Sequence, residues 1–429
     1  MCNTFICTGS GSEGPRIPKM KLLLRLAGAV LATVACSACA DPPSPGGDSP
    51  ALEAVVRDSA DIRIIENPRP PTGSRLDWHI GTEPAVSIGA REGEGPYMLH
   101  RARDALILAD GRIVVANMGS HELRVFDASG IHVATWGRRG EGPGEFNPLL
   151  QVHRWRGDSL LALYSPANHL SVLDSEGNVG RTFTLARDDS FFRVEAVSPV
   201  GAIVNSDWLP RSLDDGLSRT EETYRVKDAE GDELSLLGSF PGTEWFSVWS
   251  GTSGWIVEIS HAHRISTFAW GDLVAIAPND TYEIRAFGLD GTLKRIVRRD
   301  HDLVAPTAAH IDAEIEERVA RIPEEERAER RRELREDSQE VPLPETFPAF
   351  AAAKADLVNH LWVREYEIPG EGASNPVWTV FDPEGQVLGF VETPAGLDIY
   401  EIGEDYILGL ATDELGVEYI QVWSLGRSG

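Results

Sequence analysis

A repeat of 47 residues is the feature that most constrains how this chain can fold. The segments REGEGP, from residue 91, and RRGEGP, from residue 138, are separated by 47 residues. The same spacing separates the turn glycines of VFDASG and VLDSEG, Gly130 and Gly177. Weaker copies of this strand-and-turn pattern end at Gly231, Gly291, Gly385 and Gly426. The chain therefore contains six copies of one unit.

Each unit has the pattern of several short strands. In the clearest copy, apolar runs at 113–115 and 123–126 are followed by a turn at 127–130, a third run and a Gly/Pro-rich loop. A period of about 40–50 residues with several strands per unit is typical of β-propeller blades. We therefore predict an all-β fold, a six-bladed β-propeller of four-stranded antiparallel blades that spans residues 61–429.

The end of the chain indicates how the ring closes. The last copy stops soon after its strand at 419–425, which leaves its blade without a fourth strand. A propeller must close its ring or expose the edges of its sheets. We predict that an N-terminal strand, from 62–66 or 76–88, completes the blade formed by residues 397–426.

One charged segment, 307–344, interrupts the repeat. It falls between two turn glycines that are 94 residues apart, twice the repeat length. Apolar residues recur in it at helical spacing: Ile311, Ile315, Val319 and Ile322. Pro323 ends this helix and can begin a second one, whose first turn holds three glutamates that suit the helix dipole. We predict an inserted helical hairpin, which is either a solvated decoration or cap, or a docking arm.

A family resemblance supports the same fold. The segment 117–127, NMGSHELRVFD, together with the loop GRRGEGPGEF at 137–146, resembles an NHL-type repeat. Such repeats have an Asp-led turn, an aliphatic strand ending in Phe-Asp, and a Gly-Pro-Gly-Glu-Phe-like loop. Here Asn117 replaces the usual Asp, and Glu122 replaces the usual basic residue. The resemblance is strong over 85–180 and weaker beyond, and the whole chain is similar to bacterial six-bladed propeller lipoproteins.

The first 60 residues predict export and lipid attachment. Met20 is the expected start, and the basic residues and short apolar stretch after it form a secretory signal. All four cysteines lie within the first 39 residues, and the segment TVAC resembles a bacterial lipobox. We expect residues 1–35 to be the signal region and Cys36 to carry the lipid, with Cys39 as the alternative. Residues 36–60 would then form a flexible tether, and plain secretion is the alternative fate.

The charge of the chain limits its partners. Acidic residues number 67 against 40 basic ones, which gives a formal net charge of −27. Nucleic acid is a poor partner, because phosphate binding depends on basic side chains. Anionic membrane surfaces are disfavoured for the same reason. We expect membrane contact only through the lipid anchor, in a cell-envelope location facing the periplasm or the cell surface.

Two segments carry candidate ligand-binding residues. Trp245, Trp249 and Trp255 belong to the densest aromatic cluster of the chain. This cluster either packs between blades or forms a ligand-facing rim, since propeller loops carry much of the variable chemistry. Arg138 and Arg139 have side chains that can bind a carboxylate or a phosphate. Repetition of their loop one blade earlier favours a structural turn instead.

Metal binding is a further hypothesis. His261 and His263 would share one side of a strand and could share a metal ion, although no third ligand can be placed from the sequence. The family resemblance implies another possibility, because some six-bladed propellers are calcium-dependent lactonases or related hydrolases whose acidic and Asn side chains converge in the channel. The weak candidates for that role are Asn117, Asn205, Asn279 and Asp280.

The motifs that are absent favour binding over catalysis. The sequence contains no serine-hydrolase elbow, phosphate-binding loop, dinucleotide fingerprint or zinc-protease motif. We expect a lipid-anchored propeller of the cell envelope that acts as a binding or interaction module without a cofactor. Its partner would be another envelope protein or a small ligand. The alternative is a divalent-cation-dependent hydrolase similar to the propeller lactonases.

Overall fold

The chain folds into six sheets and two helices in the part of it that the structure describes. A computed structural model covers residues 53–164, 169–185, 191–208, 215–250, 253–372 and 375–427. Cys36 and Cys39, the predicted lipid acceptors, lie outside these residues. Neither helix within them has the length and apolar character needed to cross a membrane.

The first three sheets follow one another along the chain, and each runs through antiparallel neighbours. The first consists of β5 (Ala102–Ile107), β6 (Ile113–Asn117), β7 (Glu122–Phe126) and β8 (His132–Trp136). The second consists of β9 (Leu149–Arg154), β10 (Leu160–Tyr164), β11 (His169–Leu173) and β12 (Val179–Thr184). The third consists of β13 (Phe191–Val197), β14 (Ile203–Trp208), β15 (Gly216–Lys227), β16 (Glu233–Ser250) and β17 (Ser253–Glu258). A short 3₁₀ helix, η1 (Gly95–Tyr97), precedes the first sheet.

Two of the remaining three sheets, the fourth and the sixth, include strands from the N-terminal segment. The fourth consists of β18 (Ile265–Trp270), β19 (Leu273–Pro278), β20 (Glu283–Phe287) and β21 (Leu293–Arg299), to which β2 (Ile62–Asn67) and β1 (Val55–Ser59) are added. The fifth consists of β22 (Ala352–Ala355), β23 (Leu361–Arg364), β24 (Val377–Phe381) and β25 (Val387–Glu392). The sixth consists of β26 (Leu397–Ile402), β27 (Tyr406–Thr412), β28 (Glu418–Arg427), β4 (Val86–Ile88) and β3 (Trp78–Ile80).

N-terminal strands complete the sixth sheet, as predicted. Strands β3 and β4 both pair with β28 in antiparallel register, so the later of the two predicted segments supplies the closing strands. The earlier one, β2, pairs instead with β21 in parallel register and extends the fourth sheet. An N-terminal segment and the last described strand are thereby joined in one sheet, which removes the exposed edge that the last repeat would otherwise leave.

Six clusters of buried apolar side chains hold neighbouring sheets together. Each cluster draws on two adjacent sheets, and one of them joins the sixth sheet to the first through Leu408 and Ile113. Because both faces of an inner sheet are covered, all the residues of β6 and β10 are buried. This closed ring of packed sheets is a β-propeller. The six sheets in the described residues are consistent with the six predicted blades.

The turn glycines show how the repeat is encoded. Five of them adopt φ angles between 82° and 92°, a left-handed conformation that glycine enters without a steric penalty: Gly130, Gly177, Gly231, Gly291 and Gly385. The prediction for the sixth turn glycine, Gly426, was wrong. Gly426 lies within β28, the third strand of its sheet, because the fourth strand comes from the N-terminal segment.

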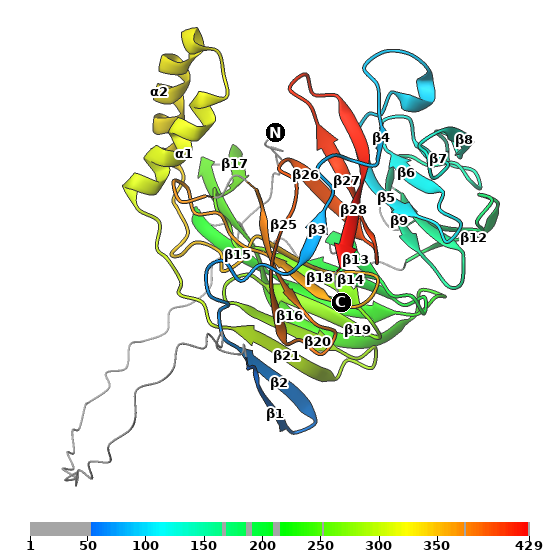
Figure 1. The fold of residues 1–429 in the computed structure, drawn as a ribbon, viewed down its shortest axis with the longest axis horizontal. Helices are drawn as coiled ribbons and strands as arrows, with labels where there is room; N and C mark the ends of the chain where they lie inside the picture. Colours follow the sequence, from blue (N-terminus) through cyan, green and yellow to red (C-terminus); the bar gives the residue numbers. More distant parts are fainter. Residues whose placement is uncertain are drawn as a thin grey trace, which may run out of the picture.

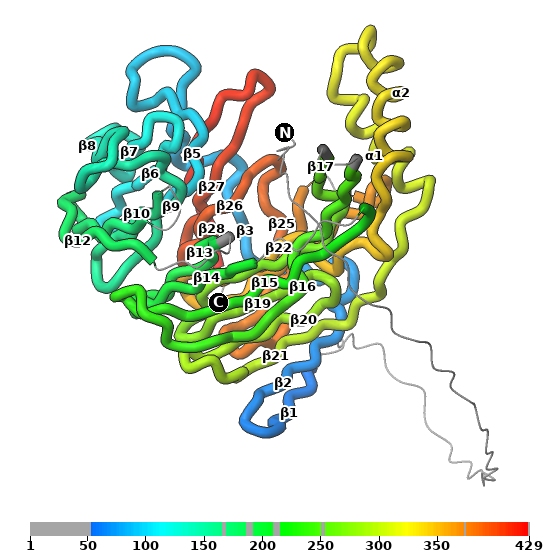
Figure 2. Tube along the Cα trace, turned by 180° about the vertical axis from the view of Figure 1, so that it is seen from behind, coloured from blue at the N-terminus to red at the C-terminus, as the bar shows by residue number. Residues whose placement is uncertain are grey.

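The predicted helical hairpin is present between the fourth and fifth sheets. It consists of α1 (Ala308–Ala320) and α2 (Glu324–Glu340), and Pro323 separates them. Ile315, Val319 and Leu334 form a small buried core between the helices. Figure 1 shows the hairpin standing beyond the sheets. In Figure 2 it extends on the opposite side of the ring from the β1–β2 hairpin.

Candidate functional site

A cavity of about 520 Å³ lies at the centre of the ring. All six sheets contribute their first strands to its wall: β5, β9, β13, β18, β22 and β26. Since propeller blades surround a central channel, this cavity is part of that channel. Turn residues that follow the first strands also line it, among them Pro199 and Gly271, so it lies towards the face where these strands end.

Glu401 is the most firmly held acidic group of the channel. Its carboxylate accepts hydrogen bonds from Nε and Nη2 of Arg154, both at 3.0 Å, from the Ile107 amide at 3.2 Å and from the Tyr406 hydroxyl at 2.5 Å. Arg154 also donates to the Ile107 carbonyl oxygen. These bonds connect the sixth, first and second sheets. Glu401 and Arg154 therefore stabilise the channel wall.

Asp104 lacks such a charged partner. Its carboxylate accepts hydrogen bonds from the amides of Ala105, at 2.9 Å, and Val152, at 3.2 Å. No basic side chain of the described residues forms an ion pair with it. Burial raises the pKa of Asp104 to about 7, and the nearby charge of Glu401 acts in the same direction. Half-buried and reachable from the channel, Asp104 can hold or release a proton near neutral pH.

Lys354 is the corresponding basic group. Its Nζ donates to the carbonyl oxygen of Ile399, on the first strand of the next sheet, and forms no ion pair within the described part of the chain. Burial lowers the pKa of Lys354 to about 8, although the carboxylates of Asp398, Asp104 and Glu401 oppose this shift. The channel thus contains an acid and a base that both change charge near neutrality, a property that is concentrated at functional sites.

Apart from Arg103, which is exposed and forms no ion pair within the described residues, the other ionisable groups of the channel are neutral or engaged. Burial lowers the pKa of His153 to about 4, so its imidazole is uncharged at neutral pH. Glu195 accepts from Arg193 at 2.6 Å and from the Ser206 hydroxyl at 2.5 Å. Arg193 also donates to Glu222 at 3.2 Å. These groups support the wall, whereas Asp104 and Lys354 remain available to a ligand.

A second hollow, of about 1020 Å³, lies between α1 and the propeller. Residues that precede first strands line it, such as Arg264 and Ala351, so it occupies the opposite face from the opening of the channel. His261 connects its two walls, because its Nε2 contacts Glu314 of α1 at 3.0 Å and its Nδ1 contacts the Tyr366 hydroxyl at 2.5 Å. The hydrogen bond with His261 lowers the pKa of Glu314. The helical hairpin is therefore attached to the ring at this point.

The two histidines do not come together as expected from a shared strand. His261 and His263 lie in the segment between β17 and β18, and His261 has a positive φ of 61°. His263 is buried, and its Nδ1 contacts Glu244 at 2.8 Å, away from the partners of His261. The described residues include no group of three or more His, Cys, Asp or Glu arranged to hold a metal ion.

The predicted asparagine candidates are mostly engaged within the fold. Asn117 Oδ1 accepts from the His100 amide at 2.8 Å, and Asn279 Oδ1 accepts from the Arg264 amide at 2.7 Å. Both bonds join the end of a second strand to the segment before the first strand of the same sheet. They are a repeated structural feature. Asn205 is buried in β14, and Asp280 pairs with Arg219.

The predicted arginines and tryptophans lie outside the channel. Arg138 is exposed and pairs with Glu145 of its own loop at 2.7 Å. The backbone of Arg139 bridges to Phe146 in the same loop, as a structural turn requires. Trp245 and Trp249 belong to β16, and Trp255 belongs to β17. All three tryptophans are half-buried, and Trp255 also lines a groove of about 490 Å³ beside the helical hairpin.

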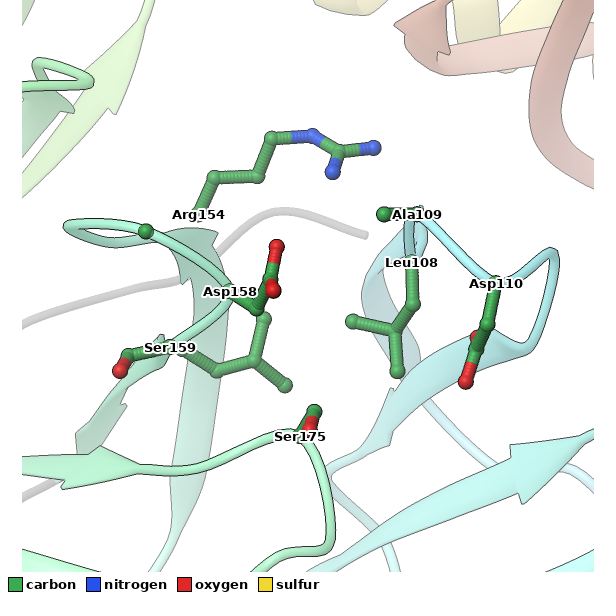
Figure 3. Close-up of a pocket in the computed structure, with 9 residues that line it drawn as sticks. Leu108, Ala109, Asp110, Arg154, Asp158, Ser159 and Ser175 are labelled. Atoms are coloured by element: carbon green, nitrogen blue, oxygen red, sulfur yellow. The ribbon is translucent and has the colours of Figure 1, made fainter.

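A smaller hollow of about 140 Å³ lies between the first two sheets (Figure 3). Leu108, Asp110 and Ser175 are among its lining residues. Figure 3 shows the guanidinium of Arg154 extending past this hollow, and Arg154 binds Glu401 in the channel instead. The hollow brings together no group with an altered pKa other than those engaged in turns and ion pairs, so it offers less chemistry than the channel.

Asp104, Lys354 and Glu401 were not among the residues predicted from the sequence. A signal for them does exist, because each is an ionisable residue inside a short apolar run: ARDALIL, AAAKADL and LDIYEI. Each of these runs is the first strand of its repeat. A search for charged residues on the first strands would have found all three.

Comparisons with known proteins found only distant structural likenesses. No protein-family model and no curated protein matches the sequence. A putative exported protein from Bacteroides fragilis is 10% identical, with 85% of this chain and 100% of that chain covered and a TM-score of 0.47. A DUF4221 member from Bacteroides vulgatus is 7% identical, with coverages of 82% and 99% and a TM-score of 0.45. Regucalcin, a calcium-binding protein from Agrobacterium tumefaciens, is 13% identical, with coverages of 80% and 96% and a TM-score of 0.35. At TM-scores below 0.5, these likenesses carry no argument about this chain.

Proposed function

We propose that this chain is a ligand-binding propeller of the cell envelope, with a small polar ligand in its central channel. One observation carries the proposal: Asp104 and Lys354 face a cavity of about 520 Å³ without an ion-pair partner in the described residues. Charged groups inside proteins are normally paired, because leaving water is costly for them. A ligand that pairs with them recovers part of that cost.

Ligand-induced stabilisation tests this proposal. The protein is screened against small anionic, cationic and zwitterionic molecules by thermal unfolding, and each stabilising compound is retested on Lys354→Met and Asp104→Asn. A ligand present at 100 times its Kd stabilises the folded chain by about 2.7 kcal/mol, and we expect at least one channel variant to lose most of this. Lys294→Met, which removes an exposed lysine on β21, is the matched control. Equal stabilisation of all the variants would contradict a channel site.

The envelope location is a separate part of the proposal. The secretory signal, the lipobox-like TVAC segment and the polar tether after Cys36 support it. Labelling cells with a clickable fatty acid should modify the wild-type protein and the Cys39→Ala variant but not Cys36→Ala. Labelling that persists in Cys36→Ala and disappears in Cys39→Ala would move the anchor to Cys39. No label in the wild type would favour plain secretion.

The segment 307–344 is proposed as an arm that contacts another envelope protein. Its helices project beyond the sheets and are attached to the ring through Glu314. Interhelical ion pairs stiffen them, such as Arg331–Glu316 at 2.7 Å and Arg335–Asp312 at 3.2 Å. Cross-linking in native envelopes compares the intact chain with one in which a Gly/Ser loop replaces 307–344. We expect a specific cross-linked partner to disappear with the arm, provided that circular dichroism shows an intact propeller. A partner retained by the shortened chain would assign the contact to the ring.

A further inference from the structure

Lysine is scarce in this protein, and that makes the lysine of the channel unusual. Only five of the 40 basic residues are lysines, and three of these lie in the part of the chain that the structure describes: Lys227, Lys294 and Lys354. At nearly every other basic position the residue is arginine, which also forms the ion pairs of Arg154 and Arg193 with glutamates. The two side chains differ chemically, because arginine stays protonated in proteins whereas a buried lysine can release its proton and act as a nucleophile.

We propose that Lys354 captures a small oxo acid as an imine, with Arg103 binding the carboxylate of that ligand and Asp104 transferring the proton. This inference rests on the channel site of the proposed function and names its ligand class. The three residues line the same cavity and come from two first strands, β5 and β22. They supply an amine, a cation and a carboxyl group, the set that an oxo acid requires.

The position of Lys354 suits a nucleophile. Its Nζ is held by a main-chain carbonyl oxygen, that of Ile399, rather than by a carboxylate that would keep it charged. Arg103 is exposed to the channel, and no carboxylate of the described residues forms an ion pair with it. Its guanidinium can therefore take a bidentate carboxylate from a ligand. Arg154 of the channel wall and Arg193 of β13 are already paired with glutamates.

The reaction balances without a further reactant. The lone pair of neutral Nζ attacks the carbonyl carbon, and the C=O π electrons move to oxygen. One proton then leaves the positively charged nitrogen and one reaches the oxygen, both through Asp104, to give a carbinolamine with a neutral amine. The hydroxyl then leaves as water with a proton from Asp104, the nitrogen lone pair forms the C=N bond, and the nitrogen returns a proton to Asp104. Amine and carbonyl compound become imine and water, and Asp104 is restored.

The protonation states support this chemistry. Because the pKa of Lys354 is about 8 rather than the ordinary 10.5, the fraction of neutral amine at pH 7 is roughly 300-fold larger than for an ordinary lysine. A weaker base is also a weaker nucleophile, so we expect the advantage in rate to be smaller, about 10-fold. The carboxyl of Asp104, with a pKa of about 7, is partly protonated at the same pH and can donate.

Reductive trapping tests the inference directly. The full chain, extracted from envelopes in mild detergent, is treated with glyoxylate and cyanoborohydride, digested with an Asp/Glu-specific protease and mapped by mass spectrometry. Reduction converts the imine into a stable carboxymethyl amine on the lysine that formed it. We expect Lys354 to be labelled about 10-fold faster than the exposed Lys294 at pH 7. The rate should be highest between pH 7 and 8, where neutral Lys354 and protonated Asp104 coexist. Labelling of Lys354 no faster than Lys294 would overturn the inference.

Two further comparisons assign the roles of the neighbouring groups. Propionaldehyde lacks a carboxylate, so Arg103→Gln should slow the trapping of glyoxylate about 10-fold and leave that of propionaldehyde unchanged. Asp104→Asn should slow both probes alike. An equal effect of Arg103→Gln on the two probes would overturn the oxo-acid class. If Lys354 is not trapped but ligand-induced stabilisation still depends on it, imine formation at Lys354 is rejected and the proposed binding function stands. Loss of both results rejects the channel site itself.

Discussion

The stability of the ring depends on a buried ion pair between Arg299 and Glu365, and a substitution at this pair can measure that dependence. Arg299 ends β21, and its side chain has no exposed surface, whereas that of Glu365 is 18% exposed. Arg299 donates to both carboxylate oxygens of Glu365, at 2.7 and 3.0 Å, and lies 3.8 Å from the ring centroid of Tyr282. Glu365 follows β23, so this pair joins the fourth and fifth sheets.

Replacing Glu365 by Gln keeps the size of the side chain and one acceptor but removes its charge. Arg299 then stays charged in a buried position without compensation. Removing one partner of a buried ion pair costs about 3–5 kcal/mol, and we expect about 3 kcal/mol because Gln retains a hydrogen bond. The matched control is Glu283→Gln. The Glu283 side chain is 15% exposed, similar to that of Glu365, but its partners Arg298 and Arg285 are 37% and 46% exposed. Water can therefore solvate these arginines when the charge of Glu283 is lost, and we expect a cost of about 0–1 kcal/mol.

Urea unfolding at pH 7, followed by tryptophan fluorescence and circular dichroism, measures both variants. A double variant, Arg299→Met with Glu365→Leu, removes both charges and should recover part of the loss, as buried pairs replaced by apolar residues often do. Equal free energies of unfolding for Glu365→Gln and Glu283→Gln would refute the reasoning. A double variant with a lower free energy of unfolding than Glu365→Gln would also refute it. The loss of stability would then come from packing and not from the unpaired charge.

Two further predictions concern pH and ring closure. The pKa of Asp104 is about 7 in the folded chain against an ordinary 3.8, so Asp104 contributes stability that is full below about pH 4 and is lost as the pH rises towards 7. We expect Asp104→Asn to reduce this decline in the free energy of unfolding by about 1–2 kcal/mol, since channel water screens part of the pKa shift. Urea unfolding of both proteins at pH 4.5 and 7.5 measures the difference. Arg427 on β28 donates to the buried Asp356 at 2.8 Å and lies 4.7 Å from the ring centroid of Trp78 on β3. Arg427→Ala should therefore speed hydrogen exchange in β3 and β28 but not in β9–β12, and a uniform increase would contradict a local role in closure.

The repeat and the insertion could be predicted because their signals are local. A turn such as that at Gly130 needs a residue that accepts positive φ, and this requirement is met within a few positions of the chain. The boundary at Pro323 between the two helices is local for the same reason, since proline cannot continue the first helix and suits the start of the next. The buried stripe of α1, with Ile315 and Val319, follows from helical periodicity.

The site could not be predicted in this way, because it depends on ring closure. The hydrogen bonds between Arg154 and Glu401 join residues that are 247 positions apart in the sequence. The same closure places Gly426 within β28 rather than in a turn, and β2 pairs with β21 of the fourth sheet instead of the sixth. No local pattern distinguishes a strand that pairs with its neighbour from one that pairs across the whole chain.

The sequence by itself therefore determined the strands, their turns and the inserted hairpin, because each depends on steric and hydrogen-bonding preferences of a few consecutive residues. Only the tertiary structure decided that Asp104 and Lys354 face one cavity and form no ion pair within the described residues. Burial gives these two groups their altered pKa values, and burial arises only when all the sheets have packed around the channel. The backbone pattern is local, whereas the chemistry of the site belongs to the assembled ring.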